Sequence, residues 1–188
     1  MKSARRVWTK SLGLCGVLIV AWGPARAQEG GPAPGLKVNG DALVHEASKS
    51  KFTPPKGWEV AAPQSAGGSA FLSLRKPLGG VDVSISWTPL ALKMQDAVDL
   101  ETAHLEQQYG KEKVAKRDPL TVADKPVFVL TVDDGPNRNG KQASVLYLFE
   151  AGPDERSRWK VTVRGLVDKA QRNEGLKTVE GLLANFQW

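Results

Sequence analysis

The feature that most constrains the fold of this chain is a strict alternation of apolar and polar residues. Residues 81–87 read VDVSISW, and residues 159–164 repeat the pattern as WKVTVR. Successive side chains of a strand point to opposite faces, so this period of two predicts strands with one buried face and one hydrated face. Residues 127–132 and 145–149 are apolar almost throughout, which predicts strands covered on both faces. We therefore expect a sheet with helix or extended chain on both sides near its middle.

Turn-forming residues separate these runs. Residues 133–140 read DDGPNRNG, and residues 152–155 read GPDE. Both segments predict hairpin loops, so the successive strands in this part of the chain should be antiparallel.

Two segments have helical spacing. The first helix is expected from about Asp96 to Tyr109, with Asp96 as the N-cap and Gly110 just past its end. Its apolar stripe consists of Val98, Thr102, Leu105 and Tyr109.

The second helix is expected from about Glu174 to Phe186, with Asn173 as its N-cap. Gly181 would then stand inside the helix, where it costs about 1 kcal/mol relative to alanine. The buried stripe would be Leu176, Val179, Leu182, Leu183 and Phe186. The order of strands, helix, strands and helix favours the α+β class with an antiparallel β-sheet.

Residues 1–27 have the layout of a cleaved secretory signal: a basic start, an apolar run over residues 11–22 and the sequence ARA at 25–27. We expect cleavage near Ala27, a disordered spacer over residues 28–38, and a single domain over 39–188. The mature protein would be periplasmic or extracellular, and no later apolar run is long enough to span a membrane.

Removing this leader changes the charge and the cysteine content. The chain has 26 basic and 20 acidic residues, and the leader holds five of the basic ones and no acidic one, so the net charge falls from +6 to about +1. This near-neutral balance argues against a nucleic-acid partner. The only cysteine, Cys15, also lies in the leader, which excludes disulfides, thiolate nucleophiles and cysteine-bound zinc from the mature chain. The leucine before Cys15 argues against a lipid-attachment site.

Residues 52–59, FTPPKGWE, resemble the entry motif of the PsbP-like, Mog1-like and DcrB-like proteins. Residues 120–128, LTVADKPVF, are similar to the turn into a long strand in the same superfamily, and the order of elements matches over 43–188. The resemblance implies an antiparallel sheet packed between helices, an α/β/α sandwich. It also implies an accessory or binding protein, and it supplies no catalytic residue set.

The two histidines and one acidic loop are the candidate metal-binding or catalytic residues. His45 and His104 lie far apart in sequence and have no second histidine at helical spacing, so we expect both to be structural. A Ca²⁺-binding role for the loop that contains Asp133, Asp134, Asn137 and Asn139 stays open, although hairpin turns favour the same residue types.

Aromatic and basic residues supply a possible binding surface. Trp87 and Trp159 fall on the apolar faces of alternating strands and are expected in the core. Trp188 is expected to be the most exposed tryptophan, and Trp58 to cover a sheet edge. The candidate surface residues are Trp58, Arg156, Arg158 and Trp188.

We find no Gly-x-Ser-x-Gly, His-Glu-x-x-His or phosphate-loop motif in the sequence. The leading hypothesis is an exported, non-enzymatic accessory protein that binds another envelope component, with an envelope protein as partner and no cofactor or metal. A second hypothesis is a small-ligand binder (lipid, metal or metabolite) with a closed apolar pocket between sheet and helix, lined by Trp58 or Trp87. A third is a hydrolase in which an Asp or Glu meets His45 or His104 in a cleft.

Overall fold

The computed structural model describes residues 35–77, 80–133 and 142–188. The expected leader, with Cys15, lies outside the described residues, as do Asp134, Asn137 and Asn139 of the candidate loop. The first strand, β1, covers Leu36–Asn39. It begins inside the segment 28–38 that we expected to be a spacer, because the side chain of Leu36 is buried in the core.

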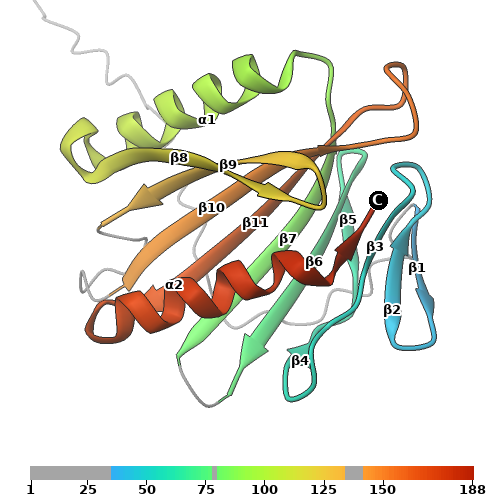
Figure 1. Cartoon of the computed structure of the whole chain (residues 1–188), viewed down its shortest axis with the longest axis horizontal. Helices are drawn as coiled ribbons and strands as arrows, with labels where there is room; N and C mark the ends of the chain where they lie inside the picture. The colour runs from blue at the N-terminus through green and yellow to red at the C-terminus, as the bar shows by residue number, and fades with distance from the viewer. Residues whose placement is uncertain (1–34, 78–79, 134–141) are drawn as a thin grey trace, which may run out of the picture.

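An eight-stranded antiparallel sheet forms the body of the protein (Figure 1). Its strands lie side by side in the order β4-β6-β7-β11-β10-β9-β8, and β5 pairs with β6. The bounds are β4 Glu59–Val60, β5 Gln64–Ala66, β6 Ser69–Lys76, β7 Val81–Pro89, β8 Val114–Val122, β9 Lys125–Val132, β10 Gln142–Ala151 and β11 Trp159–Asp168.

The strands that the sequence predicts are present and antiparallel. The alternating strands β7 and β11 pair with each other, and each buries every second side chain. The apolar runs form β9 and β10, which pair with each other, and β10 also pairs with β11. The α+β class with an antiparallel sheet is thereby confirmed.

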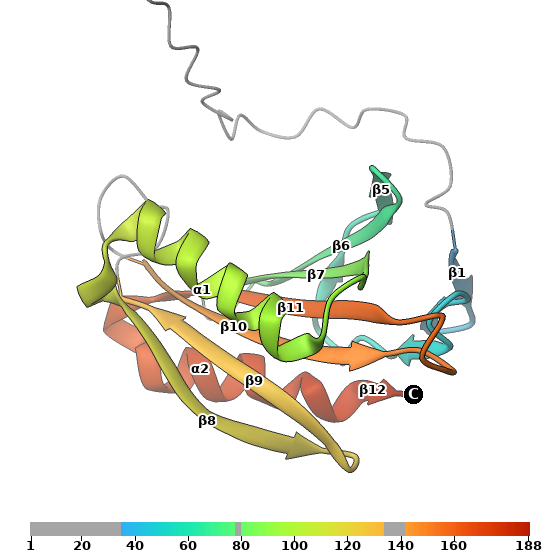
Figure 2. The same ribbon diagram turned by 90° about the horizontal axis from the view of Figure 1, so that it is seen from above.

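Two helices cover opposite faces of this sheet (Figure 2). Helix α1, Met94–Tyr109, packs its buried residues Val98 and Leu105 on one face, against Leu146 and Leu148 of β10. Helix α2, Arg172–Gly181, lies on the other face. Because successive β10 side chains enter the two different cores, almost all of β10 is buried.

Close approach of α2 to the sheet depends on a glycine in β11. A Cβ atom built on Gly165 would lie 2.5 Å from Cγ2 of Val179, closer than any real contact. The missing side chain therefore lets Val179, which is fully buried, seat against the sheet.

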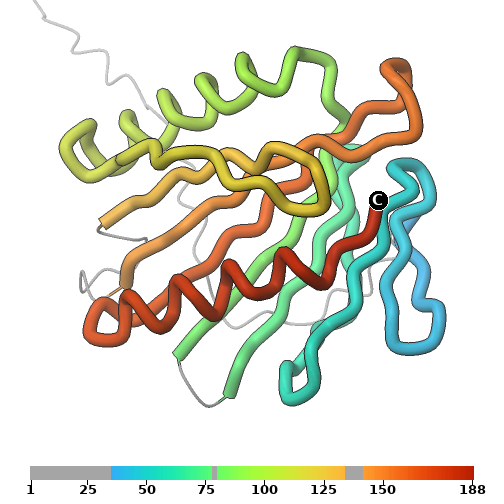
Figure 3. Tube along the Cα trace, viewed as in Figure 1, coloured from blue at the N-terminus to red at the C-terminus, as the bar shows by residue number. Residues whose placement is uncertain are grey.

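A second, four-stranded sheet has the order β1-β2-β3-β12, with β2 at Ala42–His45, β3 at Ser50–Phe52 and β12 at Phe186–Gln187. Figure 3 shows the C-terminal end of the chain running beside β3, where Phe186 pairs with Phe52. The two phenyl rings lie 4.7 Å apart, so the end of the chain is tied to a segment near its start.

Both expected helix starts differ from the structure. Helix α1 begins at Met94, and Lys93 occupies the N-cap without a side-chain hydrogen bond. Asp96 lies instead in the first turn, where its charge complements the helix dipole. Gly110 ends α1 as expected, since it has a φ of +97° and donates its N–H to the carbonyl of Glu106.

The expectation of a second helix over 174–186 is also corrected. Helix α2 starts at Arg172, so Asn173 lies within it, and it ends at Gly181, which is therefore not an interior residue. A short 3-10 turn, Leu183–Asn185, follows, and Phe186 leaves the helical path for β12. Pairing with β3 and ring contacts with Phe52 and Phe149 account for this early end.

Candidate functional site

Helix α1 covers only part of its face of the large sheet. It packs on β8, β9 and β10, whereas the polar side chains of β6 and β7 on this face are largely exposed. Figure 2 shows α1 lying over one half of the sheet while β6 and β7 extend beyond it. An open, polar region of sheet is thus left next to the C-terminal end of α1.

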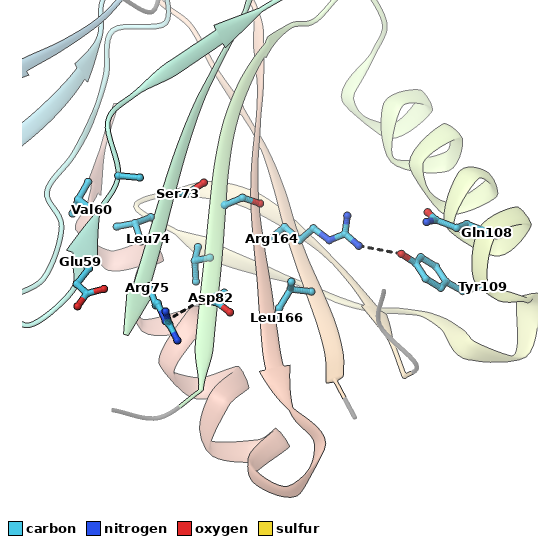
Figure 4. A pocket seen from close by; sticks show the side chains of 13 residues that line it. Glu59, Val60, Ser73, Leu74, Arg75, Asp82, Gln108, Tyr109, Arg164 and Leu166 are labelled. Atoms are coloured by element: carbon cyan, nitrogen blue, oxygen red, sulfur yellow. Dashed lines mark hydrogen bonds and ion pairs between the residues drawn. The ribbon is translucent and has the colours of Figure 1, made fainter. Parts of the chain in front are cut away.

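A groove of about 690 Å³ occupies this region (Figure 4). Its volume falls within the range of small-molecule sites in proteins. It runs between the C-terminal end of α1 and strand β4, over β6, β7 and β11. The lining residues are Glu59, Val60, Ala61, Ser73, Leu74, Arg75, Asp82, Val83, Ser84, Gln108, Tyr109, Arg164 and Leu166.

Strand register sets the polar floor of this groove. Ser73 pairs with Ser84 across β6 and β7, and Ser84 pairs with Arg164 across β7 and β11. Directly paired residues share a face of the sheet, with Cβ atoms about 5 Å apart. Two hydroxyl groups and a guanidinium therefore stand in one row across three strands.

Arg164 is the most unusual residue of the groove. Its Nη2 donates to the hydroxyl oxygen of Tyr109 at 3.3 Å, while its buried Nε has no hydrogen-bond partner. Within the described part of the chain, no carboxylate is paired with this guanidinium. An unsatisfied buried donor costs about 1–3 kcal/mol, so Arg164 has unused capacity to bind an acceptor.

Arg158 offers a direct contrast to Arg164. Its Nε and Nη2 both donate to the carboxylate of Glu150 at 2.7 Å, a bidentate pair. This arginine lowers the pKa of Glu150 below its usual value. The same residue type is therefore fully paired on one part of the sheet and incompletely paired in the groove.

The charges of the groove are balanced. Arg75 and Asp82 face each other at 3.8 Å, and both are exposed. Glu59, which pairs in register with Arg75, adds a second carboxylate. With Arg164, the lining carries two cations and two anions, so the groove has a localised cationic centre and little net charge.

The groove chemistry suits binding. Hydroxyl and guanidinium groups supply donors, and Leu166 and the ring of Tyr109 supply apolar surface. The lining contains no histidine and no cysteine, the residues that most often activate a nucleophile or take up its proton.

The structure does not bring the four predicted surface residues into this groove. Arg156 is exposed at the β10–β11 turn, and Arg158 is paired with Glu150. Trp58 is half-buried and packs against the main core. None of these residues, nor Trp188, lines the groove, so the pocket differs from the predicted closed cavity lined by Trp58 or Trp87.

Trp188 is half-buried, as Trp58 and Trp159 are, so its place as the most exposed tryptophan stays a prediction. Its ring centroid lies 4.7 Å from that of Phe149 and 5.9 Å from that of Phe186. Lys125 lies with Nζ 5.7 Å from the ring centroid of Trp188, and donates to the Glu150 carbonyl at 3.4 Å. Trp87 is fully buried as predicted, while Trp159 is half-buried.

The two histidines have different environments. His45 is fully buried, stacked at 5.7 Å on Trp87 and in edge contact at 4.5 Å with Trp159. Its Nδ1 is 2.8 Å from the hydroxyl of Ser48, and burial lowers its pKa to about 4, which keeps the ring neutral. These contacts give His45 a structural role.

His104 is exposed on α1 and lines a separate hollow of about 400 Å³ together with Glu101. The Glu101 carboxylate is paired with Lys160 at 3.2 Å. The carboxylate beside His104 is therefore engaged by a lysine.

Of the candidate Ca²⁺ loop, only Asp133 is described, and its carboxylate is paired with Arg172 at 2.5 Å. Residues 35–77, 80–133 and 142–188 contain no group of three or more His, Cys, Asp or Glu side chains placed to hold a metal ion. Nor does any helix in these ranges have the length and apolar character needed to cross a membrane.

Sequence reasoning missed the groove because its residues are far apart in the chain. Ser84 and Arg164 are 80 positions apart and meet only through the pairing of β7 with β11. The sequence did indicate one feature of the groove, namely the polar residues that alternate with apolar ones in β7 and β11. These residues identify the face of the sheet that points away from the main core, but they do not indicate what covers that face.

The sequence matches no family model, and no curated protein is similar to it. Among solved structures, the fold is similar to the solution structure of cyanobacterial PsbP (CyanoP) from Synechocystis sp. PCC 6803. The superposition has a TM-score of 0.49 with 9% sequence identity, and covers 87% of this chain and 96% of that chain.

Proposed function

We propose that this protein is an exported, non-enzymatic accessory protein that binds another component of the cell envelope in the groove beside α1. The observation that carries this proposal is the uncovered half of the sheet face, hollowed to about 690 Å³. A groove lined by hydrogen-bond donors and apolar side chains, without histidine or cysteine, is suited to recognition.

Two features of the sequence support the accessory role. Residues 1–27 have the organisation of a secretory signal, which would deliver the protein to the envelope. The motif at 52–59 resembles that of a superfamily of accessory proteins. An envelope protein is the partner that we expect, and a small ligand held in the same groove is the second candidate, which the volume of the groove favours.

The test is to block the groove and follow what the protein binds. Ser84 is exposed on the groove floor, so Ser84→Trp would fill the groove without entering the core. Ala115→Trp, at an exposed position of the edge strand β8, places the same side chain outside the groove and serves as the matched control.

Each variant would be expressed from the full chain in the source cells, recovered gently from the envelope, and measured by native mass spectrometry. We expect an added mass on the wild type and on Ala115→Trp, and its loss from Ser84→Trp. A protein-sized mass would support the envelope-protein partner, and a mass of a few hundred daltons the small ligand. An added mass that survives Ser84→Trp would contradict binding in the groove.

A further inference from the structure

We infer that Arg164 is the anchor of a carboxylate-binding subsite, and that the groove takes a monocarboxylic acid with an apolar body. This inference rests on the proposed function, because it assigns a ligand class to the same groove. It goes further in naming the group that is recognised and the residue that recognises it.

The first step concerns the pairing of cations on this face of the sheet. Arg75 faces Asp82, and Lys160 faces Glu101, so each of these cations has a carboxylate nearby. Arg164 instead contacts a phenolic hydroxyl and leaves its Nε–H without an acceptor. A guanidinium in this state favours an incoming oxyanion, since a carboxylate can accept from two of its N–H groups at once.

The second step concerns the neighbours of Arg164 on the groove floor. Ser84 stands beside Arg164 in register, and Ser73 stands beside Ser84. The Ser84 hydroxyl can donate to an acceptor position of a carboxylate that the arginine does not occupy, and Ser73 extends the polar row away from it. Tyr109 holds one edge of the guanidinium, which limits its freedom before a ligand arrives (Figure 4).

The third step distinguishes a carboxylate from a phosphate. Asp82 and Glu59 lie in the same groove and balance Arg75 and Arg164. A ligand with a single negative charge can pair with Arg164 alone, whereas a dianion would gain no net attraction from the rest of the lining. The balance of charges therefore favours a monoanion.

The fourth step concerns the remainder of the ligand. Leu166 and the ring of Tyr109 are partly exposed in the groove. These two side chains offer apolar contact close to Arg164. An acid with a short apolar body would cover them while its carboxylate reaches the guanidinium.

The test uses 4-phenylbutyrate as the probe, with 4-phenylbutanol as the uncharged analogue and 4-phenylbutylphosphonate as the analogue that carries more charge. Binding to the mature protein, residues 28–188, would be measured by isothermal titration calorimetry in mildly alkaline buffer, where the phosphonate is a dianion and the carboxylate a monoanion. The Nε–H resonance of Arg164 would be followed by nitrogen-15 NMR, because a purely structural arginine would not respond to the probe.

We expect 4-phenylbutyrate to bind more tightly than either analogue and to shift the Arg164 resonance. Arg164→Gln should weaken its binding at least about tenfold, as expected for loss of a charged hydrogen-bond donor. Arg164→Lys keeps the positive charge but loses the paired donors of the guanidinium. Its affinity for 4-phenylbutyrate should lie between that of the wild type and that of Arg164→Gln. Arg156→Gln makes the same change at an exposed position outside the groove and should bind as the wild type does.

Equal binding of the alcohol, or tighter binding of the phosphonate, would overturn the inference, as would no binding of any probe to a folded protein. A comparison of acetyl-Leu-Leu with its amide tests the source of the carboxylate. Tighter binding of this acid than of 4-phenylbutyrate would support a partner chain's C-terminus, and the reverse a free small acid.

The failure of this inference and that of the proposed function are distinguishable. If no probe binds but Ser84→Trp still abolishes the envelope complex, the carboxylate subsite is wrong and the groove remains the binding site. If 4-phenylbutyrate binds through Arg164 while the envelope complex survives Ser84→Trp, the subsite is supported and the accessory role of the groove is contradicted.

Discussion

The indole nitrogen of Trp87 donates a hydrogen bond of 2.9 Å to the hydroxyl oxygen of Ser50, across 37 residues of chain. Trp87 belongs to the large sheet and Ser50 to the small one, and both side chains are fully buried. The Ser50 hydroxyl also lies 2.7 Å from that of Ser48, which contacts His45. A buried polar network therefore joins the two sheets.

Removing the Ser50 hydroxyl should destabilise the protein. Ser50→Ala leaves the buried N–H of Trp87 without its acceptor, so we expect a loss of about 1–3 kcal/mol in the free energy of unfolding. Urea denaturation followed by tryptophan fluorescence measures this change. Ser65→Ala, at an exposed position of β5, is the control and should change stability by less than about 0.5 kcal/mol. Equal stability of the two variants would contradict the role of the network.

A methyl group at Gly165 should disturb the docking of α2. Gly165→Ala places Cβ within 2.5 Å of Val179, and overpacking of a core of this kind costs about 1–3 kcal/mol. The melting temperature and the free energy of unfolding would both fall. Gly181→Ala makes the same change at the end of α2, where a Cβ would meet no atom within 4 Å. That variant should be at least as stable as the wild type, because alanine favours the helix. A neutral Gly165→Ala would show that α2 can shift freely.

The buried, neutral His45 should make the protein less stable at mildly acidic pH, where its imidazole is protonated only in the unfolded chain. Burial lowers the pKa of this ring to about 4, against an ordinary value of 6.5 in the unfolded chain. Above pH 6.5 the ring is neutral in both states, so its contribution to stability is constant. As the pH falls from 6.5 towards 4, the unfolded chain takes up the proton first and stability is lost, by about 2 kcal/mol at pH 5.

Urea denaturation of the wild type and of His45→Gln at pH 7 and pH 5 measures this linkage. On going from pH 7 to pH 5, His45→Gln should lose less free energy of unfolding than the wild type. At each pH the variant should still be less stable than the wild type. His104→Gln, at the exposed histidine, should keep the pH dependence of the wild type. The same slope in the wild type and in His45→Gln would rule out His45 as its source.

The Arg158–Glu150 pair should contribute modestly to stability. Its bidentate geometry is favourable, but the side chains are 23% and 38% exposed, so water and salt screen the attraction. A double-mutant cycle with Arg158→Ala and Glu150→Ala should give a coupling energy of about 0.5–1 kcal/mol that decreases at high salt. The more exposed Lys116–Asp99 pair is a matched control and should couple more weakly. A coupling energy of zero would indicate that Arg158 is free for other contacts.

Local patterns allowed much of the fold to be predicted. Alternation over 81–87 and 159–164 identified β7 and β11, and the turn residues identified their antiparallel neighbours. Gly110 marked the end of α1 correctly, because only a residue without a side chain adopts its φ of +97° readily. Each of these features depends on residues a few positions apart.

Where long-range contacts compete with local preference, the sequence predictions were less accurate. The apolar spacing through Phe186 suited a helix, but Phe186 gains strand pairing with Phe52 and leaves the helical path. Phe186 also contacts Phe149 and Trp188, and this aromatic cluster is not indicated by the helical spacing. Phe52 and Phe149 both lie far along the chain from Phe186.

The sequence by itself determined the strands, the turns and the outward-facing polar positions, because these follow from spacings of two to four residues. Only the tertiary structure decided that β7 lies beside β11, which brings Ser84 next to Arg164, and that α1 packs on β8, β9 and β10 and leaves β6 and β7 open. The groove and its incompletely paired arginine arise from strand order and helix placement. Those depend on burial of apolar surface summed over the whole chain, which no short segment encodes.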